Sequence, residues 1–263
     1  MEDQYWEERG IAYRTNRFDH SRETLVFIHG LGTGCAGWAS FETALESKYN
    51  ILTYDLRGHG HSLRYKHYDD YAPEKLADDL IALVQVLEIR SCSLISTSFG
   101  TLIALLFLRR YPGMVHKNLL LAPVYKNQPL TVGAEKPKPP LLAKMPGLMP
   151  FSRSHGRRMD YSGFEYAEDL QWGRIVHEIR NMSLRIYLFY LYHLNGFTDY
   201  GWWSQIEVPT TILHGTKDSF SPYHSAVELS KIIPNARLVP LDGGNHIVTI
   251  NNRNEILAQI AKG

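Results

Sequence analysis

Residues 94–101, Leu-Ile-Ser-Thr-Ser-Phe-Gly-Thr, constrain the fold of this chain more than any other stretch. An apolar run ends abruptly at Ser98, and apolar side chains then recur at helical spacing over residues 102–108. This pattern predicts a strand, a sharp turn with a serine at its apex, and a helix. Such a turn brings two backbones close together, so the residues two before and two after the serine must be small. Ser96 and Gly100 meet that requirement.

Ser98 is therefore a candidate nucleophile, although the same short pattern also fits an ordinary strand-to-helix turn. A serine hydroxyl is a weak nucleophile, so it needs a base, and the base needs an acid that orients it. Asp218 follows a predicted strand at 209–214, and His246 follows a predicted strand at 236–240. Because parallel strands end at the same edge of a sheet, we expect the three side chains to meet there.

Other acids and bases fit this arrangement less well. In this kind of site the nucleophile comes first along the chain, the acid second and the base last. His59 and His61 precede Ser98 in the chain, so neither fits the place of the base. We expect His214 to end its strand and to pack locally. Asp242 is a rival for the acid, but it lies close to the candidate base in sequence and is typical of a turn. We therefore retain the serine, aspartate and histidine named above as the predicted catalytic set.

A glycine-containing loop, His-Gly-Leu-Gly at 29–32, follows an apolar strand predicted at 24–28. Glycines allow this loop to pass close to the candidate nucleophile. The backbone N–H of Leu31 can then pair with that of Phe99 to bind an oxyanion. We expect the side chain of His29 to hold the loop in place rather than to transfer protons.

With these residues assembled, the chain resembles the α/β-hydrolase family over nearly its whole length. The resemblance rests on five motifs in the order typical of that family. They are His29-Gly30-Leu31-Gly32 with Trp38, Asp55-Leu56-Arg57-Gly58-His59-Gly60, Ser96-Thr97-Ser98-Phe99-Gly100, His214-Gly215 through Asp218, and Gly244-Asn245-His246. The resemblance implies a triad of Ser98, Asp218 and His246. It also implies that the loop containing Arg57 is structural, with the arginine hydrogen-bonded to neighbouring carbonyls.

Two positions depart from the family pattern. The family usually has glycine where this chain has Ser96, and often a second glycine where it has Thr101. Serine is small enough for the turn, whereas Thr101 is expected to narrow the space under the start of the helix and to alter its packing. Because the nucleophile position holds serine rather than aspartate, the resemblance does not favour the dehalogenase or epoxide-hydrolase branches.

Predicted strands and helices alternate along most of the chain. We expect strands near 24–28, 50–54, 92–97, 118–122, 209–213 and 236–240, and helices near 36–47, 74–88, 100–110, 222–233 and 252–261. This alternation predicts a parallel sheet with helices on both faces, and a hairpin at about 3–15 would add antiparallel edge strands. The expected fold is α/β, with a mostly parallel eight-stranded sheet flanked by helices and a helical cap inserted after the sixth strand.

The cap is expected between Val124 and Val208, where the alternation stops. The predicted division is a core of residues 1–124 and 208–263 and a cap of residues 125–207. The second part of the cap is helical in pattern and dense in aromatic residues. We expect most of these aromatics to form the core of the cap and some to line the roof of an acyl pocket.

The first part of the cap, residues 126–158, combines basic and apolar side chains. The basic residues are Lys126, Lys136, Lys138, Lys144, Arg153, Arg157 and Arg158, and the single acid is Glu135. The apolar residues among them include Leu141, Leu142, Leu148, Met149 and Phe151. Two interpretations stay open: a solvated loop, or a lid that makes weak contact with an anionic lipid interface.

Composition narrows the class of protein. The chain has 263 residues, which suits one α/β domain with an insertion, and a net charge of +1 gives no argument for nucleic-acid binding. It contains no apolar run long enough to span a bilayer, and residues 1–20 lack a signal-peptide core, so we expect a cytoplasmic protein. Cys35 and Cys92 are expected to be reduced, and no zinc-ligand spacing appears.

Together these features predict a serine hydrolase that cleaves carboxylic esters through an acyl-enzyme, without cofactor or metal. The expected partner is a small-molecule ester, with a hydrophobic acyl group. An acyltransferase, thioesterase, lactonase or carbon–carbon bond hydrolase on the same triad stays an alternative, because fold does not choose among these reactions. A ligand-binding, receptor-like protein with slow turnover is a further alternative.

Overall fold

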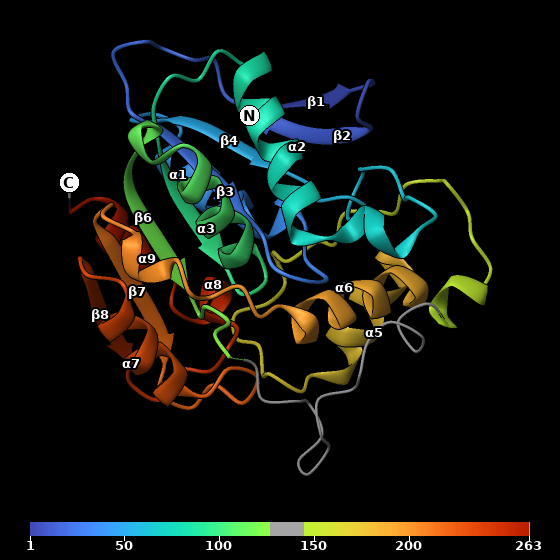
Figure 1. The fold of residues 1–263 in the computed structure, drawn as a ribbon. Helices are drawn as coiled ribbons and strands as arrows, with labels where there is room; N and C mark the ends of the chain where they lie inside the picture. The colour runs from blue at the N-terminus through green and yellow to red at the C-terminus, as the bar shows by residue number, and fades with distance from the viewer. Residues whose placement is uncertain (127–144, 263) are drawn as a thin grey trace.

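An eight-stranded sheet runs through the part of the chain that the computed structural model describes, residues 1–126 and 145–262 (Figure 1). Its strands are β1 (Glu2–Trp6), β2 (Ile11–Thr15), β3 (Thr24–Ile28), β4 (Asn50–Tyr54), β5 (Cys92–Thr97), β6 (Val115–Leu121), β7 (Thr210–Gly215) and β8 (Ala236–Leu241). They lie in the order β1-β2-β4-β3-β5-β6-β7-β8. The pairs β1–β2 and β2–β4 are antiparallel, and the other five pairs are parallel. The predicted mostly parallel sheet and its N-terminal hairpin are confirmed.

Helices cover both faces of this sheet, as the alternation predicted. On one face lie α2 (Pro73–Val86), α3 (Gly100–Arg110) and α7 (Tyr223–Ile232). On the other lie α1 (Ala39–Leu45), α8 (Val248–Asn251) and α9 (Arg253–Ile260). Short 3₁₀ helices occupy Cys35–Trp38, Tyr68–Tyr71, Pro112–Met114, Met145–Leu148 and Trp203–Gln205.

Strand β3 shows how the sequence divides the core in two. All of its residues are buried, because a central parallel strand has helices above and below it. Val26 and Ile28 point into the core under α2 and α3, whereas Leu25 and Phe27 point into the core under α1 and α9. This alternation fixes the register of β3 and delivers the loop that follows it to the carboxyl edge of the sheet.

The described part of the segment between β6 and β7 contains the α-helices α5 (Trp172–Met182) and α6 (Leu184–Gly196). They lie side by side, away from the sheet (Figure 1). We call the described part of this segment, residues 145–208, the insertion. Its aromatic side chains pack together as expected for a small core, with the Tyr200 and Trp203 ring centroids 4.8 Å apart. Tyr190 joins the insertion to the rest of the molecule, because its hydroxyl donates to the carbonyl oxygen of Arg57 at 2.9 Å.

The last helix agrees with the sequence prediction, and a short helix precedes it. A helix was expected near residues 252–261, and α9 covers Arg253–Ile260. The short helix α8, Val248–Asn251, was not predicted. Asn252 separates the two helices and has φ −124° and ψ 34°, outside the helical region, so the chain changes direction there. The expected helix near residues 36–47 is divided, into the 3₁₀ turn Cys35–Trp38 and α1.

Most of the basic and apolar stretch predicted at 126–158 lies outside the described residues. Those positions are Glu135, Lys136, Lys138, Leu141, Leu142 and Lys144. Among the described positions, Leu148 is 87% exposed, whereas Arg158 is ion-paired with Asp3 and Asp55. Within the ranges that the structure describes, no helix is both long enough and apolar enough to cross a membrane. Contact with a lipid interface therefore stays a prediction.

Candidate active site

Ser98 lies in a sharp turn between β5 and α3, as the sequence predicts. Its backbone is left-handed, with a φ of 49°, which is uncommon for a residue that carries a Cβ atom. The turn brings the start of α3 against the end of β3. A Cβ atom added at Gly100 would lie 2.5 Å from the carbonyl oxygen of His29 and 2.7 Å from that of Ile28. Only glycine fits at this position without moving the strand.

The two departures from the family pattern are accommodated. Ser96 is fully buried, and its hydroxyl lies 3.5 Å from the carbonyl oxygen of Leu119 on the neighbouring strand. Thr101 is also buried, and its hydroxyl donates to the carbonyl oxygen of Ser98 at 2.6 Å. The Thr101 hydroxyl therefore adds a second hydrogen bond to a carbonyl oxygen that also accepts the backbone N–H of Thr101 at 3.0 Å.

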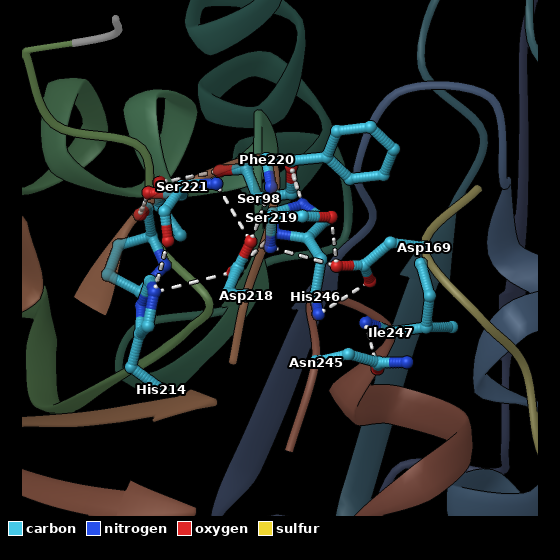
Figure 2. A network of polar contacts seen from close by, with 12 residues as sticks. Ser98, Asp169, His214, Asp218, Ser219, Phe220, Ser221, Asn245, His246 and Ile247 are labelled. Atoms are coloured by element: carbon cyan, nitrogen blue, oxygen red, sulfur yellow. Dashed lines mark hydrogen bonds and ion pairs between the residues drawn. The ribbon is translucent and has the colours of Figure 1, made fainter. Parts of the chain in front are cut away.

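The structure brings together the three side chains of the predicted catalytic set (Figure 2). His246 Nε2 lies 2.8 Å from Ser98 Oγ, and His246 Nδ1 lies 2.7 Å from Asp218 Oδ2. An ionised carboxylate only accepts hydrogen bonds, so Nδ1–H donates to Asp218. Nε2 is then free to accept the hydroxyl proton of Ser98. This orientation is the one that a general base requires.

Asp218 is held as an ionised, hydrogen-bonded carboxylate. Its Oδ1 atom accepts from the backbone N–H groups of Phe220 at 2.8 Å and Ser221 at 2.7 Å. Burial acts to raise the pKa of Asp218, but the charge and hydrogen bond of His246, the Ser221 amide and His214 together lower the pKa below its ordinary value. Asp218 is therefore ionised at neutral pH, where its carboxylate accepts the hydrogen bond from Nδ1 of His246.

The rival residues lie elsewhere. Asp242 is exposed, whereas His214 is buried in β7 with its Nε2 atom 2.7 Å from the carbonyl oxygen of Ser221. Burial lowers the pKa of His214, against the opposing effects of Asp218 and of the hydrogen bond to that carbonyl. His214 thus packs locally, as predicted, and it also lies 3.3 Å from Asp218.

Two neutral histidines hold the loop at 29–32. Burial lowers the pKa of His29 and that of His59, so each ring can accept a hydrogen bond. His29 Nε2 accepts from the N–H of Leu56 at 2.9 Å, and His59 Nε2 accepts from the N–H of Gly32 at 3.0 Å. The expectation that His29 holds the loop is confirmed. His59 does the same, which the sequence alone did not indicate.

The loop at 29–32 lies against the turn that contains Ser98. A Cβ atom added at Gly30 would lie 3.1 Å from the Cβ atom of Ser98, so the loop and the turn are in close contact. The two amides predicted to bind an oxyanion come from these two segments, Leu31 from the loop and Phe99 from the turn. Among the described residues, neither N–H group has a hydrogen-bond acceptor. Their role in binding an oxyanion stays a prediction.

Arg57 is structural, but its main partner differs from the prediction. Neighbouring carbonyls were expected, and the carbonyl oxygen of Asp70 is one partner at 3.1 Å. The stronger contact is with the carboxylate of Asp79, which accepts from Nε at 2.5 Å and from the Nη2 atom at 2.8 Å. This bidentate pair was not predicted, although Asp79 lies three residues after Leu76 and four before Leu83, on the apolar face of the helix.

A cavity of about 390 Å³ lies above Ser98 and His246. Apolar side chains of the insertion form much of its wall, among them Ile175, Ile179, Tyr187 and Leu191. Leu170 and Trp172 also line it and are 58% and 70% exposed, so they mark its mouth. The wall contains one buried ion pair, between Arg174 and Glu178, whose Nη1 and Oε1 atoms are 2.8 Å apart.

The hydrogen bonds of Asp169 were not predicted from the sequence. Asp169, in the insertion, accepts the backbone N–H of His246 at 2.8 Å through Oδ1 (Figure 2). Its Oδ2 atom accepts the N–H of Ser219 at 2.9 Å and the hydroxyl of Ser219 at 2.6 Å. Asp169 lies in a stretch without helical or strand periodicity and far from both partners in sequence, so no local pattern identified it.

The buried thiols and the metal-ligand residues show no further site. Cys35 and Cys92 are both free and buried, and burial raises the pKa of Cys92 to about 12. Within the described ranges, no group of three or more histidine, cysteine, aspartate or glutamate side chains is placed to hold a metal ion.

A model of the alpha/beta hydrolase family matches residues 25–260. The chain belongs to the alpha/beta hydrolase family. The match runs from β3 through α9, without the N-terminal hairpin of β1 and β2, and it includes all five sequence motifs, so the resemblance is confirmed.

Similar proteins include other members of this family. The AB hydrolase superfamily protein YisY of Bacillus subtilis is 26% identical over 97% of this chain and 96% of its own length. The 2-hydroxy-6-oxo-2,4-heptadienoate hydrolase of Pseudomonas putida is 28% identical over 49% of this chain and 50% of its own length. The enol-lactonase of Burkholderia xenovorans LB400 superposes with a TM-score of 0.73 and 21% identity, covering 95% of this chain and 94% of that one. That last likeness concerns the fold.

Proposed function

We propose that this alpha/beta hydrolase cleaves carboxylic esters of small molecules through an acyl-enzyme. The observation that carries the proposal is the hydrogen-bonded series Ser98–His246–Asp218, with contacts of 2.8 and 2.7 Å. It lies at the base of a cavity large enough for a small substrate. A serine within reach of an oriented histidine, beside two free amides, has the parts needed for acyl transfer.

In the first half of the reaction, Ser98 Oγ attacks the ester carbonyl carbon while His246 Nε2 takes the hydroxyl proton. The carbonyl oxygen becomes an oxyanion, which accepts hydrogen bonds from the amides of Leu31 and Phe99. Asp218 stabilises the imidazolium that has formed. The tetrahedral intermediate collapses, His246 returns its proton to the departing alkoxide, and an alcohol leaves the acyl-enzyme.

In the second half, a water molecule attacks the acyl carbon, and His246 takes one of its protons. A second tetrahedral oxyanion forms in the same place, held by the same two amides. When it collapses, the bond to Ser98 Oγ breaks and the serine recovers its proton from His246. The carboxylic acid is released, and the enzyme is back in its starting state without a cofactor.

The cavity supports a small or medium-sized, largely apolar acyl group. Its volume of about 390 Å³ lies near the lower end of the range for small-molecule sites. Its wall is mostly apolar, so we propose that a hydrophobic acyl chain fills it. We also propose that the insertion acts as a cap, with residues 1–124 and 208–263 as the core and 125–207 as the cap.

A series of p-nitrophenyl esters, from acetate to palmitate, tests this function. We expect turnover to be highest for short and medium acyl chains, because a long chain exceeds the cavity, and to be lost in Ser98→Ala. Absence of hydrolysis across the series in the wild-type protein would contradict the proposal. So would equal turnover by the Ser98→Ala variant.

Carbon–carbon bond hydrolysis is a second candidate, supported by the likeness to the Pseudomonas putida hydrolase over about half of each chain. The same triad can serve that reaction, because the reacting group is again a carbonyl. The dienoate in that enzyme's name belongs in the same assay. Faster cleavage of the dienoate than of any ester would favour the second candidate.

A further inference from the structure

We propose that Asp169 is a positioning residue that holds His246, the base, and Asp218, the acid, in a fixed position relative to each other. This inference rests on the proposed function. The carboxylate accepts from the backbone of His246 with one oxygen and from Ser219 with the other. Ser219 directly follows Asp218. A single side chain of the insertion therefore makes hydrogen bonds to both the loop of His246 and the loop of Asp218 (Figure 2).

The surroundings of Asp169 show that both carboxylate oxygens are committed. The residue is 7% exposed, and burying a carboxylate is costly unless its oxygens are hydrogen-bonded. Here they accept two backbone N–H groups and one hydroxyl, at 2.8, 2.9 and 2.6 Å. No lysine or arginine among the described residues forms an ion pair with this carboxylate. Its bonding capacity therefore goes to the two loops.

The hydrogen bond from the backbone of His246 to Asp169 lies next to the reacting groups, where a small displacement has a large effect on the rate. The ring of His246 must keep 2.7 Å to Asp218 and 2.8 Å to Ser98 at the same time. Releasing its backbone N–H would let the ring move relative to both partners. A displacement of 1 Å at a reacting group can cost about a hundredfold in rate. The hydrogen bonds of Asp169 thus act on the rate without any contact with the substrate.

Asp169 is itself held by helix α5. Arg174 donates from Nη2 to the carbonyl oxygen of Asp169 at 3.0 Å and from Nη1 to the carboxylate of Glu178. Glu178 lies against the loop at 29–32, because a Cβ atom added at Gly32 would be 3.1 Å from its Oε2 atom. The insertion therefore contacts the loop at 29–32, the loop of Asp218 and the loop of His246. Asp169 itself contacts the last two of these loops.

A neighbouring set of hydrogen bonds supports the same connection. The carbonyl oxygen of Ala167 accepts from Asn245 at 2.8 Å and from Asn251 at 2.8 Å. The N–H of Ala167 donates to the side chain of Asn251 at 2.9 Å. Residues 167–169 thus lie along the loop that contains His246, and these hydrogen bonds keep Asp169 next to that loop.

The substitution Asp169→Asn tests the proposal with little change in size. An amide has one accepting oxygen, so its NH₂ group would face either the N–H of His246 or that of Ser219. We expect kcat for a soluble ester to fall about ten- to a hundredfold, with KM within about twofold of wild type. The matched control is Asp160→Asn, an exposed aspartate of the same insertion, which should leave both constants unchanged.

A role in fold stability alone would give a different pattern. Titration with a fluorophosphonate counts the active sites, so kcat per titrated site separates lost protein from slower chemistry. The rate of fluorophosphonate labelling of Ser98 should fall with kcat in Asp169→Asn. If kcat per site and the labelling rate both stay within twofold of wild type, Asp169 does not position the histidine.

The pH–rate profile gives a second, independent readout. The groups that face the His246 ring are Asp218 and Ser98, Phe220 lies edge-on to it, and Asp169 and His214 are the nearest other titratable groups. A displaced ring slows the reaction at every pH, so kcat/KM of Asp169→Asn should stay below the wild-type value across the whole profile. A variant that reaches the wild-type plateau at any pH would contradict the proposal.

A milder variant covers the case in which Asp169→Asn does not fold. Ser219→Ala removes only the hydroxyl contact of 2.6 Å and leaves both backbone donors in place. We expect about a fivefold loss in kcat, the amount that corresponds to one hydrogen bond. Unchanged kcat in this variant would overturn the proposal. If the wild-type protein is neither labelled nor active on esters, the proposed function fails instead, and the two failures are thus distinguishable.

Discussion

At Ser98 the backbone adopts a left-handed conformation although the residue carries a Cβ atom. Such a conformation costs about 1–2 kcal/mol and persists only where the surroundings enforce it. The close packing of Gly100 on the end of β3 and the contact of Gly30 with Ser98 supply that enforcement. The strained turn lifts the hydroxyl out of the sheet edge and towards His246.

A comparison of two substitutions at this position tests the strain. Ser98→Gly and Ser98→Ala both remove the hydroxyl, so both should be inactive. Glycine tolerates the left-handed region, whereas alanine does not, so we expect Ser98→Gly to be about 1 kcal/mol more stable than Ser98→Ala in urea unfolding. A less stable glycine variant would mean that the turn is not strained.

The acid and the base of the triad should differ in their contributions. His246→Ala removes the proton acceptor and should lower kcat by about a millionfold, whereas Asp218→Asn should lower it by about ten thousandfold. The order follows because an orienting group acts only through the base. Steady-state kinetics on one soluble ester gives both values. Wild-type activity in Asp218→Asn would transfer the acid role to another residue, with Asp242 the first to substitute.

The lowered pKa of Asp218 also predicts a dependence of stability on pH. A carboxylate with a lowered folded-state pKa stabilises the fold above its ordinary value of 3.8, and this contribution is lost as pH falls through the folded-state pKa. We expect the difference in free energy of unfolding between wild type and Asp218→Asn to be constant near neutral pH. It should shrink below about pH 4, as measured by urea unfolding at several pH values. A difference that grows on acidification would contradict the assignment of the lowered pKa.

At the scale of elements, the unit β5–turn–α3 depends on one close approach. Gly100→Ala would place a Cβ atom 2.5 Å from a backbone oxygen of His29, and backbone cannot move aside as a side chain can. We expect a loss of about 3 kcal/mol in the free energy of unfolding. The control Gly173→Ala, at an exposed helical position with open space around it, should be neutral or slightly stabilising. Equal stability of the two variants would show that the turn has room to spare.

The parts of this site that the sequence predicted are those with local signals. The strand before Ser98, the small residues around it, and the strand ends before Asp218 and His246 each follow from patterns within a few residues. Asp169 could not be found that way, because its partners come from two distant loops. The helix α8 was also not predicted, because its four residues, Val248–Asn251, are too few to show a helical period.

At the scale of the whole molecule, the insertion and the sheet together make the cavity. The sheet edge supplies Ser98, Asp218 and His246, whereas α5 and α6 supply much of the apolar wall. Neither part encloses a substrate without the other. The contacts of Asp169 and Arg174 then make the placement of the insertion part of the geometry of the reaction.

Trp172, at the mouth of the cavity, should affect binding rather than folding. Because it is 70% exposed, Trp172→Ala should change the free energy of unfolding by no more than about 0.5 kcal/mol. Its ring covers apolar substrate surface in our account, so KM for a medium-chain ester should rise about tenfold while KM for an acetate ester stays nearly constant. Val176→Ala is the control, since Val176 is an exposed apolar residue of α5 outside the cavity wall. Parallel changes in both variants would place the substrate elsewhere.

The most direct test of the central claim is the site of covalent modification by a fluorophosphonate. The wild-type protein should gain the mass of one adduct, and peptide mapping should place it on Ser98. Ser98→Ala should gain none, and His246→Ala should be modified far more slowly. An unmodified wild-type protein, or an adduct on a different serine that persists in Ser98→Ala, would contradict the account of Ser98 as the nucleophile.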